Sequence, residues 1–265
     1  MNFTSLIADH SLYSIFALLL FAFLAGFIDS IVGGGGLIQL PALLINLPNT
    51  PLPVLFGTNK IAGLSGTTVA AYQYSKRIKF NFKLLIAISF FSFIASFLGA
   101  KTVSHLDGDS LRPVILIILI VMAIYTFIKK DLGAIQSKEL SLQKQLIFGS
   151  IMGVLVGFYD GFFGPGAGSF LVLGFVVLLG FEFVVASAYA KFINCVTNIS
   201  ALMVFVRQGS YIIELALLMA ICNVIGSIIG SRVALKRGNG FIRVIFLVVV
   251  FALIVRYGYD VFFRD

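Results

Sequence analysis

The feature that most constrains this chain is a series of long apolar runs separated by short polar segments. A helix needs about 20 apolar residues to cross the hydrocarbon core of a bilayer. Runs close to that length lie near residues 12–32, 54–75, 83–103, 112–128, 145–162, 185–206, 213–234 and 242–262, and shorter apolar pieces lie at 37–47 and 168–181. We therefore predict an all-α, polytopic membrane protein with ten helical elements, of which eight or ten cross the bilayer.

The composition excludes a soluble globular protein. Hydrophobic residues make up 60% of the chain and charged residues 11%, whereas soluble domains carry about 25% charged residues. Residues 1–11 contain no Lys or Arg, and the apolar run that follows is longer than the core of a signal peptide, so we expect a retained first helix. Cys195 and Cys222 have neither CxxC spacing nor companion histidines, and we predict no metal or other cofactor.

One pattern occurs twice in the chain. The segment "LAGFIDSIVGGGG", which contains Asp29, aligns with "LVGFYDGFFGPGA", which contains Asp160, at an offset of 160 − 29 = 131. The register then continues without a gap and matches Gly33 to Gly164, Gly35 to Gly166, Lys60 to Lys191, Ala70 to Ala201, Ser96 to Ser227, Gly99 to Gly230 and Arg112 to Arg243. We predict two repeats of about five helical elements, residues 1–131 and 132–265, that together form one membrane domain.

The basic loops indicate that the two repeats face opposite ways. Lys and Arg gather in cytoplasmic loops of membrane proteins. In the first repeat they follow the third element (Lys76, Arg77, Lys79, Lys83), and in the second they follow the fourth (Arg232, Lys236, Arg237, Arg243). An inverted repeat with both termini outside the cytoplasm places these loops and the basic join between the repeats inside. The net charge of +8 is then a topology signal and requires no nucleic-acid partner.

Two Gly-rich segments predict helix breaks inside the membrane. They are Gly33–Gly36, including Gly34 and Gly35, and Gly164–Gly168, which contains Gly166 and Pro165. Inverted-repeat transporters bind substrates where such broken helices meet near the bilayer midplane, and the N-terminus of the helix after a break favours an anion. The alternative is that small residues only let helices pack closely, which is our interpretation of Gly153, Gly157, Gly161, Gly226 and Gly230.

Two aspartates and two lysines lie within the apolar runs. Asp29 and Asp160 each precede a break by four residues, and a carboxylate in hydrocarbon needs a partner. Lys60 and Lys191 are the predicted partners. The alternative is that each lysine extends along its helix to the membrane interface, and it stays open especially for Lys60, which lies about a turn and a half from its helix start.

Polar side chains accompany the lysines on a face predicted to turn away from lipid. The helix of Lys60 has small or polar residues at Asn59, Gly63, Gly66, Ala70 and Gln73, and the helix of Lys191 has them at Ala190, Asn194, Thr197 and Ala201. Asn198 lies seven residues after Lys191 on nearly the same face, and Asn194 lies between them in height. We predict that a lysine and amides of this kind surround a small oxyanion.

The paired motifs "GFIDSIVGGGGLIQLPALL", followed by "GTNK", and "GFYDGFFGPGAGSFLVLGF" resemble the sulfite exporter TauE/SafE family, also called the toluene sulfonate uptake permease family. The resemblance covers nearly the whole chain. It implies a bacterial inner-membrane permease for small anions such as sulfite or sulfoacetate, with a binding region at Gly33–Gly36 with Gln39 and at Gly164–Gly168 with Ser169. One departure is that Pro41 follows the first break where Val172 follows the second, so the two half-sites differ.

These features predict an ATP-independent secondary transporter that works by alternating access, with Asp29 and Asp160 as ion-pair or proton-coupling groups. The site then comprises Gly33, Gly34, Gly35, Gly36, Gln39, Asn59, Lys60, Gly164, Gly166, Gly168, Ser169, Lys191, Asn194 and Asn198. An anion-selective channel built from the same residues is the alternative. The chain has no Walker A, HExxH or GxSxG motif, and we predict no enzymatic activity. Direction, exact anion and assembly into a homo-oligomer stay open.

Overall fold

The computed structural model describes residues 12–104, 140–234, 236, 251 and 255. This part of the chain is all α-helical, as predicted, and no strand occurs among the described residues. Its helices are α2 (Leu12–Val32), α3 (Gly36–Asn46), α4 (Leu52–Ser75), α5 (Phe82–Val103), α7 (Leu142–Phe162), α8 (Ala167–Val177), α9 (Phe183–Arg207) and α10 (Ile213–Ala234). The elements expected near 112–128 and 242–262 lie outside the described residues.

Helix length separates the described helices into two kinds. Five of them, α2, α5, α7, α9 and α10, are long and apolar enough to cross a membrane. Helix α4 has 24 residues but carries the polar stripe around Lys60. Helices α3 and α8 have 11 residues each, which is about 16 Å at the α-helical rise and about half of a ~30 Å hydrocarbon core. These two short helices follow the Gly-rich segments and do not span by themselves.

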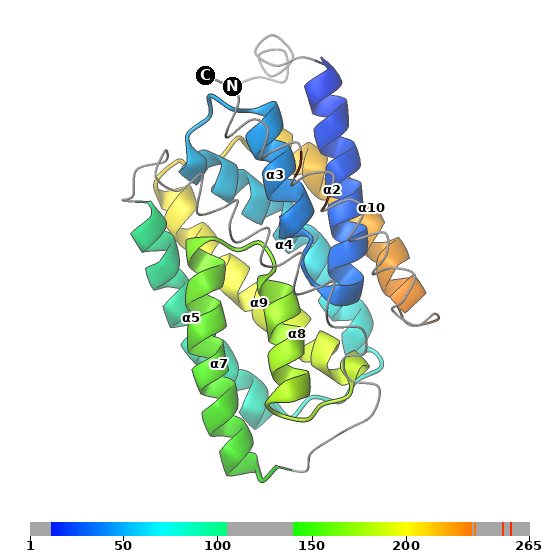
Figure 1. Cartoon of the computed structure of the whole chain (residues 1–265), viewed down its shortest axis with the longest axis vertical. Helices are drawn as coiled ribbons and strands as arrows, with labels where there is room; N and C mark the ends of the chain where they lie inside the picture. The colour runs from blue at the N-terminus through cyan, green and yellow to red at the C-terminus, as the bar shows by residue number, and fades with distance from the viewer. Residues whose placement is uncertain (1–11, 105–139, 235, 237–250, 252–254, 256–265) are drawn as a thin grey trace.

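The helix boundaries follow the repeat that the sequence indicates. Helices α3 and α8 begin at Gly36 and Ala167 and have equal lengths, and α5 and α10 begin at Phe82 and Ile213; both pairs are therefore 131 positions apart (167 − 36 and 213 − 82). In Figure 1, α2 runs downward from the upper end of the view, whereas α7 runs upward from the lower end. This arrangement fits the predicted inverted duplication, which stays a prediction.

Equivalent hydrogen bonds connect the two halves. The Ser96 hydroxyl donates to the Thr197 carbonyl at 2.8 Å, and the Ser227 hydroxyl donates to the Gly66 carbonyl at 2.7 Å. Each bond joins one half to the other, and the two are related by the same offset. Helix packing is likewise exchanged, since α2 packs along α10 and α5 packs along α7, while α4 and α9 pack against each other. The halves therefore interleave around a common centre.

Glycines allow the exchanged helices to approach closely. A Cβ at Gly157 or Gly161 would lie within 3 Å of the backbone of α5, and one at Gly226 would lie within 3 Å of the backbone of α2. Gly153 and Gly230 contact the same two helices. Small residues at such interfaces drive close packing where the surrounding lipid removes the hydrophobic driving force between helices. The packing interpretation of these five glycines is therefore correct.

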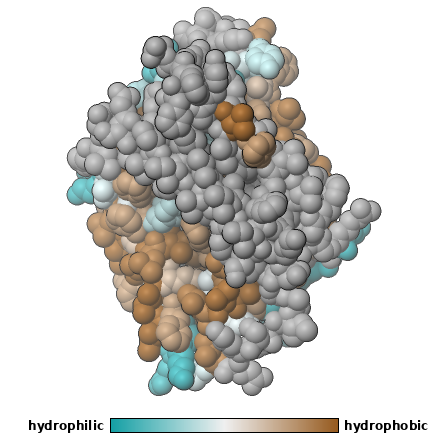
Figure 2. Space-filling model, viewed as in Figure 1, coloured by the Kyte–Doolittle hydropathy of each residue, from teal (hydrophilic) through white to brown (hydrophobic). Residues whose placement is uncertain are grey.

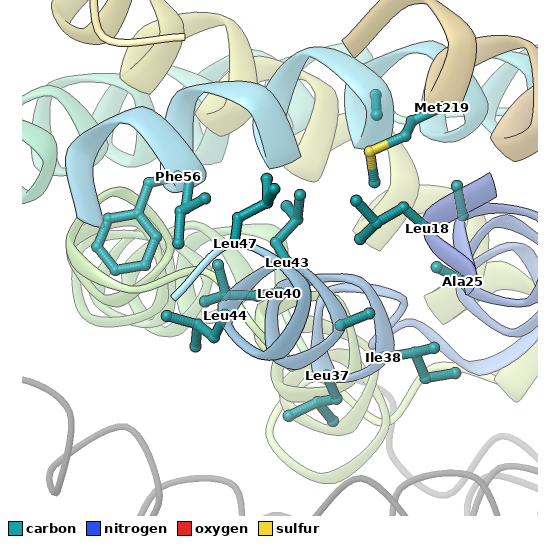
Figure 3. Close-up of a cluster of buried hydrophobic side chains, with 14 of the residues drawn as sticks. Leu18, Ala25, Leu37, Ile38, Leu40, Leu43, Leu44, Leu47, Phe56 and Met219 are labelled. Carbon is teal, nitrogen blue, oxygen red and sulfur yellow. The ribbon is translucent and has the colours of Figure 1, made fainter. Parts of the chain in front are cut away.

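A hydrophobic cluster holds α3 beside the longer helices. Figure 3 shows Leu40, Leu43 and Leu44 of this short helix, with Leu47 directly after its end, near Phe56 of α4. Leu18 and Ala25 of α2 and Met219 of α10 belong to the same cluster. All of these side chains are buried, because the short helix lies inside the bundle rather than at its surface. A helix of 11 residues thus gains its stability from tertiary packing.

The outer surface of α5 and α7 is apolar. Figure 2 shows brown, hydrophobic residues over this face and hydrophilic residues at its lower end. Exposed apolar side chains recur every four residues, at Ile86, Phe90 and Ile94 on α5 and at Ile147, Ile151 and Leu155 on α7. Such stripes face lipid when a chain spans a membrane, and the polar stripes of α4 and α9 face inward.

Candidate functional site

The two Gly-rich breaks meet at the centre of the bundle. Gly33 and Gly34 have φ angles of 72° and 113°, and Gly164 and Gly166 have φ angles of 94° and 83°. Residues with a Cβ rarely adopt this left-handed region, which explains why glycine is required. A Cβ at Gly33 would also collide with the backbone at Gly168. The two breaks therefore contact each other directly.

Two side chains tie the breaks in place. The Ser169 hydroxyl donates to the carbonyl of Val32 at 3.1 Å and also to the carbonyl of Gly33. The Tyr159 hydroxyl donates to the carbonyl of Pro165 at 2.6 Å. These three bonds satisfy carbonyl groups that the interruption of α2 and α7 leaves without a helical donor. The Ser169 side chain is thus committed to the opposite break.

A small polar cavity lies beside the crossing of the breaks. Its volume is about 40 Å³, and because a water needs roughly 10–15 Å³ on this measure, the space suits a few waters or one small ion. The cavity is lined by Asp29, Gly34, Gly35, Gly36, Gln39, Asn59, Lys60, Gly63, Thr67, Asp160, Gly164, Gly166, Gly168, Asn194, Asn198 and Asn223. Both breaks and five long helices, α2, α4, α7, α9 and α10, contribute to this lining.

Lys60 on α4 pairs with Asp160, which lies near the end of α7 in the other half. The Lys60 Nζ lies 2.8 Å from Asp160 Oδ1 and donates to the Asp160 carbonyl at 2.7 Å. Lys60 and Asp160 are each only 3% exposed, so the lysine does not extend to the membrane interface. The second carboxylate oxygen of Asp160 is buried without a hydrogen-bond partner among the described residues. A buried acceptor in this state is costly, and it lies in a residue that lines the cavity.

Lys191 on α9 pairs with Asp29 on α2, again across the halves. The Lys191 Nζ lies 2.9 Å from Asp29 Oδ2 and also donates to the Asp29 carbonyl. The backbone N–H groups of Gly34 and Gly35 donate to the other carboxylate oxygen at 3.2 and 3.3 Å, and the Thr67 hydroxyl donates to Oδ2 at 3.1 Å. The Asp29 carboxylate therefore has a partner at each oxygen.

Amide side chains form the remaining polar wall. The Asn223 amide donates to Gln39 Oε1 at 2.8 Å, and the Gln39 amide donates to the Asn59 carbonyl at 3.3 Å. On the opposite side, the Asn198 amide donates to Asn194 Oδ1 at 2.6 Å. These bonds fix the orientation of the side chains and leave further N–H donors that an acceptor in the cavity can use.

The structure brings most of the sequence-predicted residues to one place. Of the predicted set, Gly33, Ser169 and Lys191 do not line the cavity, and all the others do. Gly33 and Ser169 form the contact between the breaks, and Lys191 lies behind Asp29, fully buried.

Three cavity residues were not predicted from the sequence, namely Gly63, Thr67 and Asn223. Gly63 and Thr67 are the equivalents of Asn194 and Asn198 at the offset of 131 (194 − 63 and 198 − 67). Subtracting the offset of 131 from the predicted positions 194 and 198 would have identified both residues. Asn223 is an amide in the otherwise apolar helix α10, a weaker signal of the same kind.

The cavity lining combines hydrogen-bond donors with the carboxylates of two ion pairs. No group of three or more His, Cys, Asp or Glu side chains gathers anywhere in the described part of the chain. The cavity instead offers one ammonium, five amide side chains and backbone N–H groups of a helix start, all of which can donate hydrogen bonds. Asp29 and Asp160 each pair with one lysine, so the formal charges of the two pairs cancel.

Known proteins resemble this chain over most of its length. A family model described as "Sulfite exporter TauE/SafE" matches residues 18–257. A Sinorhizobium protein named "probable membrane transporter protein ORF9" is 39% identical over 236 residues, which cover 89% of this chain and 88% of the relative. The "probable membrane transporter protein YfcA" of Escherichia coli strain K12 is 37% identical over 242 residues, covering 90% and 87%. A "probable membrane transporter protein" of Haemophilus influenzae is 30% identical over 238 residues, covering 90% and 92%.

Proposed function

The chain belongs to the sulfite exporter TauE/SafE family, and from this premise we propose that it is an ATP-independent secondary transporter of a small anion in the inner membrane of a bacterium. The anion class that we propose is a sulfur oxyanion or small organosulfonate, such as sulfite or sulfoacetate. Relatives named as membrane transporters support transport rather than catalysis. The proposed orientation places both termini outside the cytoplasm.

The observation that carries this proposal is the position of Lys60 in the cavity where the breaks cross. Its ammonium group lies 2.8 Å from Asp160 Oδ1 and lines a space of about 40 Å³. The start of α8 borders the same space through Gly166 and Gly168. Among the described residues the backbone N–H of Gly168 has no acceptor. An anion in the cavity therefore meets a cation and a helix N-terminus together.

The proposed mechanism is alternating access around this site. In the empty protein, Asp160 neutralises Lys60, so that the site does not carry an isolated buried charge. An entering anion takes the place of the carboxylate as the partner of Lys60, and a proton taken up on Asp160 keeps the site neutral. Transport would then be coupled to protons. The two interleaved halves rock about the crossed breaks and expose the cavity to one side at a time.

The size of the cavity favours a small substrate. A space of about 40 Å³ accommodates an ion of a few heavy atoms, and larger organosulfonates require the breaks to separate. The donors converge from several directions, as a pyramidal or tetrahedral oxyanion requires. A carrier fits a site with many converging donors better than a channel, because a channel needs sites that an ion leaves as readily as it enters.

The test is uptake by proteoliposomes that contain the purified full chain. Labelled sulfite, sulfate, sulfoacetate, taurine and acetate are presented with and without an imposed pH gradient. We expect saturable accumulation of one sulfur anion, driven by the gradient and lost in Lys60→Met/Asp160→Asn. Lys83→Gln, a change at an exposed lysine far from the cavity, is the control and should transport like the wild type.

Two results would contradict the proposal. Flux that neither saturates nor accumulates substrate against a gradient would identify a channel. Equal uptake by the wild type and Lys60→Met/Asp160→Asn would show that the transported anion does not bind at Lys60.

A further inference from the structure

A second, larger pocket lies at the end of the molecule where α4 and α10 finish. The two helices pack along each other, and in Figure 1 both run toward the lower right. The pocket has a volume of about 460 Å³ and is lined by Val69, Tyr72, Gln73, Lys76, Arg77, Ile228, Arg232 and Lys236. It shares no lining residue with the central cavity.

The pocket concentrates positive charge that nothing in the described structure neutralises. Four of its eight lining residues are Lys or Arg, and none is acidic. The described ion pairs are the two at the centre of the bundle, and they involve none of these four cations. Lys76 lies over the ring of Tyr72, 4.2 Å from its centroid. Like charges gathered in this way repel one another, and an anion placed among them is stabilised.

A polar donor is oriented within the same pocket. The Ser231 hydroxyl donates to Gln73 Oε1 at 2.8 Å. The same hydroxyl also lies 2.7 Å from the Ser227 carbonyl, which competes for its single proton. Gln73 adds an amide side chain to the pocket, with N–H groups that a ligand acceptor can use. The pocket therefore presents ammonium, guanidinium and amide donors, which together match the oxygens of a phosphate group.

One wall of the pocket is apolar. Val69 and Ile228 lie one to two helical turns inside the cations, toward the middle of the membrane, and Tyr72 is 61% exposed. A free inorganic anion makes no use of such a wall, whereas a lipid has acyl chains to place on it. The pocket also lies at the ends of membrane helices, where phospholipid headgroups and interfacial tyrosines are found.

We propose that this pocket binds an anionic phospholipid. The phosphate group lies among Arg77, Arg232 and Lys236, and the acyl chains run along Val69 and Ile228. Because the site joins the end of α4 from one half to the end of α10 from the other, a bound lipid connects the two repeats. The site is independent of the proposed anion transport, since the two cavities have no residue in common.

The test is lipid retention by the purified full chain, measured by native mass spectrometry after incubation with phosphatidylglycerol or with neutral phosphatidylcholine. We expect retention of phosphatidylglycerol over phosphatidylcholine by the wild type. Arg77→Gln/Arg232→Gln should weaken phosphatidylglycerol binding at least about tenfold. The matched control is Lys79→Gln/Lys83→Gln, which removes the same charge near the end of α4, outside the pocket, and should leave binding within about twofold of the wild type.

Three outcomes would overturn the proposal. Equal weakening in both double variants would show that basic loops attract lipid without a site. Equal retention of the two lipids would show that the pocket does not select an anionic headgroup. Displacement of phosphatidylglycerol by millimolar inorganic phosphate would assign the pocket to a free anion. Arg77→Lys/Arg232→Lys keeps the charge and should retain binding, which checks that the Gln variants do not act through misfolding.

Discussion

The two central ion pairs are equivalent by sequence offset, yet their surroundings differ. Asp29 is held by Lys191, by the Thr67 hydroxyl and by two backbone N–H groups. Asp160 is held by Lys60 alone, and one of its carboxylate oxygens has no partner among the described residues. Lys60 lines the cavity, whereas Lys191 lies outside it. The Asp29 pair has the contacts of a fixed structural pair, and the Asp160 pair is the one that we propose changes its partner.

Two substitutions within the repeat explain this difference. Gly34 supplies an N–H group to Asp29, but its equivalent at the offset of 131 is Pro165 (165 − 34), which has no N–H group. Thr67 supplies a hydroxyl to Asp29, but its equivalent is Asn198, which donates to Asn194 instead. At the offset of 131 both charges are therefore present in each half, whereas the donors around Asp29 have no counterparts around Asp160. Two ion pairs at equivalent positions can therefore differ in how many hydrogen bonds hold each carboxylate.

The largest expected effect that tests this comparison is on stability. Removing one member of a buried ion pair costs about 3–5 kcal/mol because the other charge remains buried. In Lys60→Met, Asp160 loses its only described side-chain donor, whereas in Lys191→Met, Asp29 keeps three donors. We therefore expect Lys60→Met to lower the free energy of unfolding more, as measured by thermal unfolding in detergent. Adding Asp160→Asn should restore most of the loss, and an equal loss in the two lysine variants would contradict the comparison.

The second prediction concerns transport by the paired neutral variants. Lys60→Met/Asp160→Asn should reduce uptake by about 100-fold or more, because the anion loses a buried charge contact of about 3 kcal/mol. Lys191→Met/Asp29→Asn should reduce uptake by less than about tenfold, since Lys191 does not reach the cavity. The measurement is the initial rate of uptake into proteoliposomes for each double variant, normalised to the amount of folded protein. The assignment of roles is wrong if the second variant loses as much as the first.

The third prediction makes the two pairs more alike. Pro165→Gly/Asn198→Thr restores at the second break the two donors that Asp29 has at the first. The added donors should hold the Asp160 carboxylate in place beside Lys60, and gradient-driven uptake should fall about tenfold, which corresponds to about 1.4 kcal/mol. The readout is the dependence of uptake on external pH, which should weaken. Gly34→Ala is a control for backbone strain at the first break. The substitution keeps the N–H group at a position where φ is 113°.

Much of the fold was accessible from the sequence, because apolar length and the offset of 131 act on long stretches of chain. The short helices α3 and α8, the inward polar stripes and the glycine contacts all follow from these patterns. The sequence did not predict that each aspartate pairs with the lysine of the other half. Pairing Asp29 with Lys60 or with Lys191 satisfies charge equally well, and only the packing of α2 and α9 decides between them.

The sequence also did not predict which of the two lysines lines the cavity. Position in the sequence favoured Lys191 as the buried cation, since Lys60 lies near the start of its helix. In the structure both are buried, and it is Lys60 that lines the cavity. Pro165 was interpreted only as a helix breaker, although its missing N–H group also removes a donor from Asp160. Such an effect depends on the distance between a backbone group and a carboxylate, which the pattern of residues does not contain.

The smallest expected effect concerns the contact that holds the two breaks together. The Ser169 hydroxyl donates to two carbonyls of the first break, and its equivalent in that break is Ile38 (169 − 131), so the second break supports the first without a return bond. Ser169→Ala should lower the free energy of unfolding by about 1 kcal/mol, the net value of a typical hydrogen bond. Substrate KM should stay within about twofold because Ser169 does not line the cavity. Ser75→Ala, at an exposed serine that bonds only within its own turn, should change neither quantity, and a large rise in KM for Ser169→Ala would instead place its hydroxyl in contact with the anion.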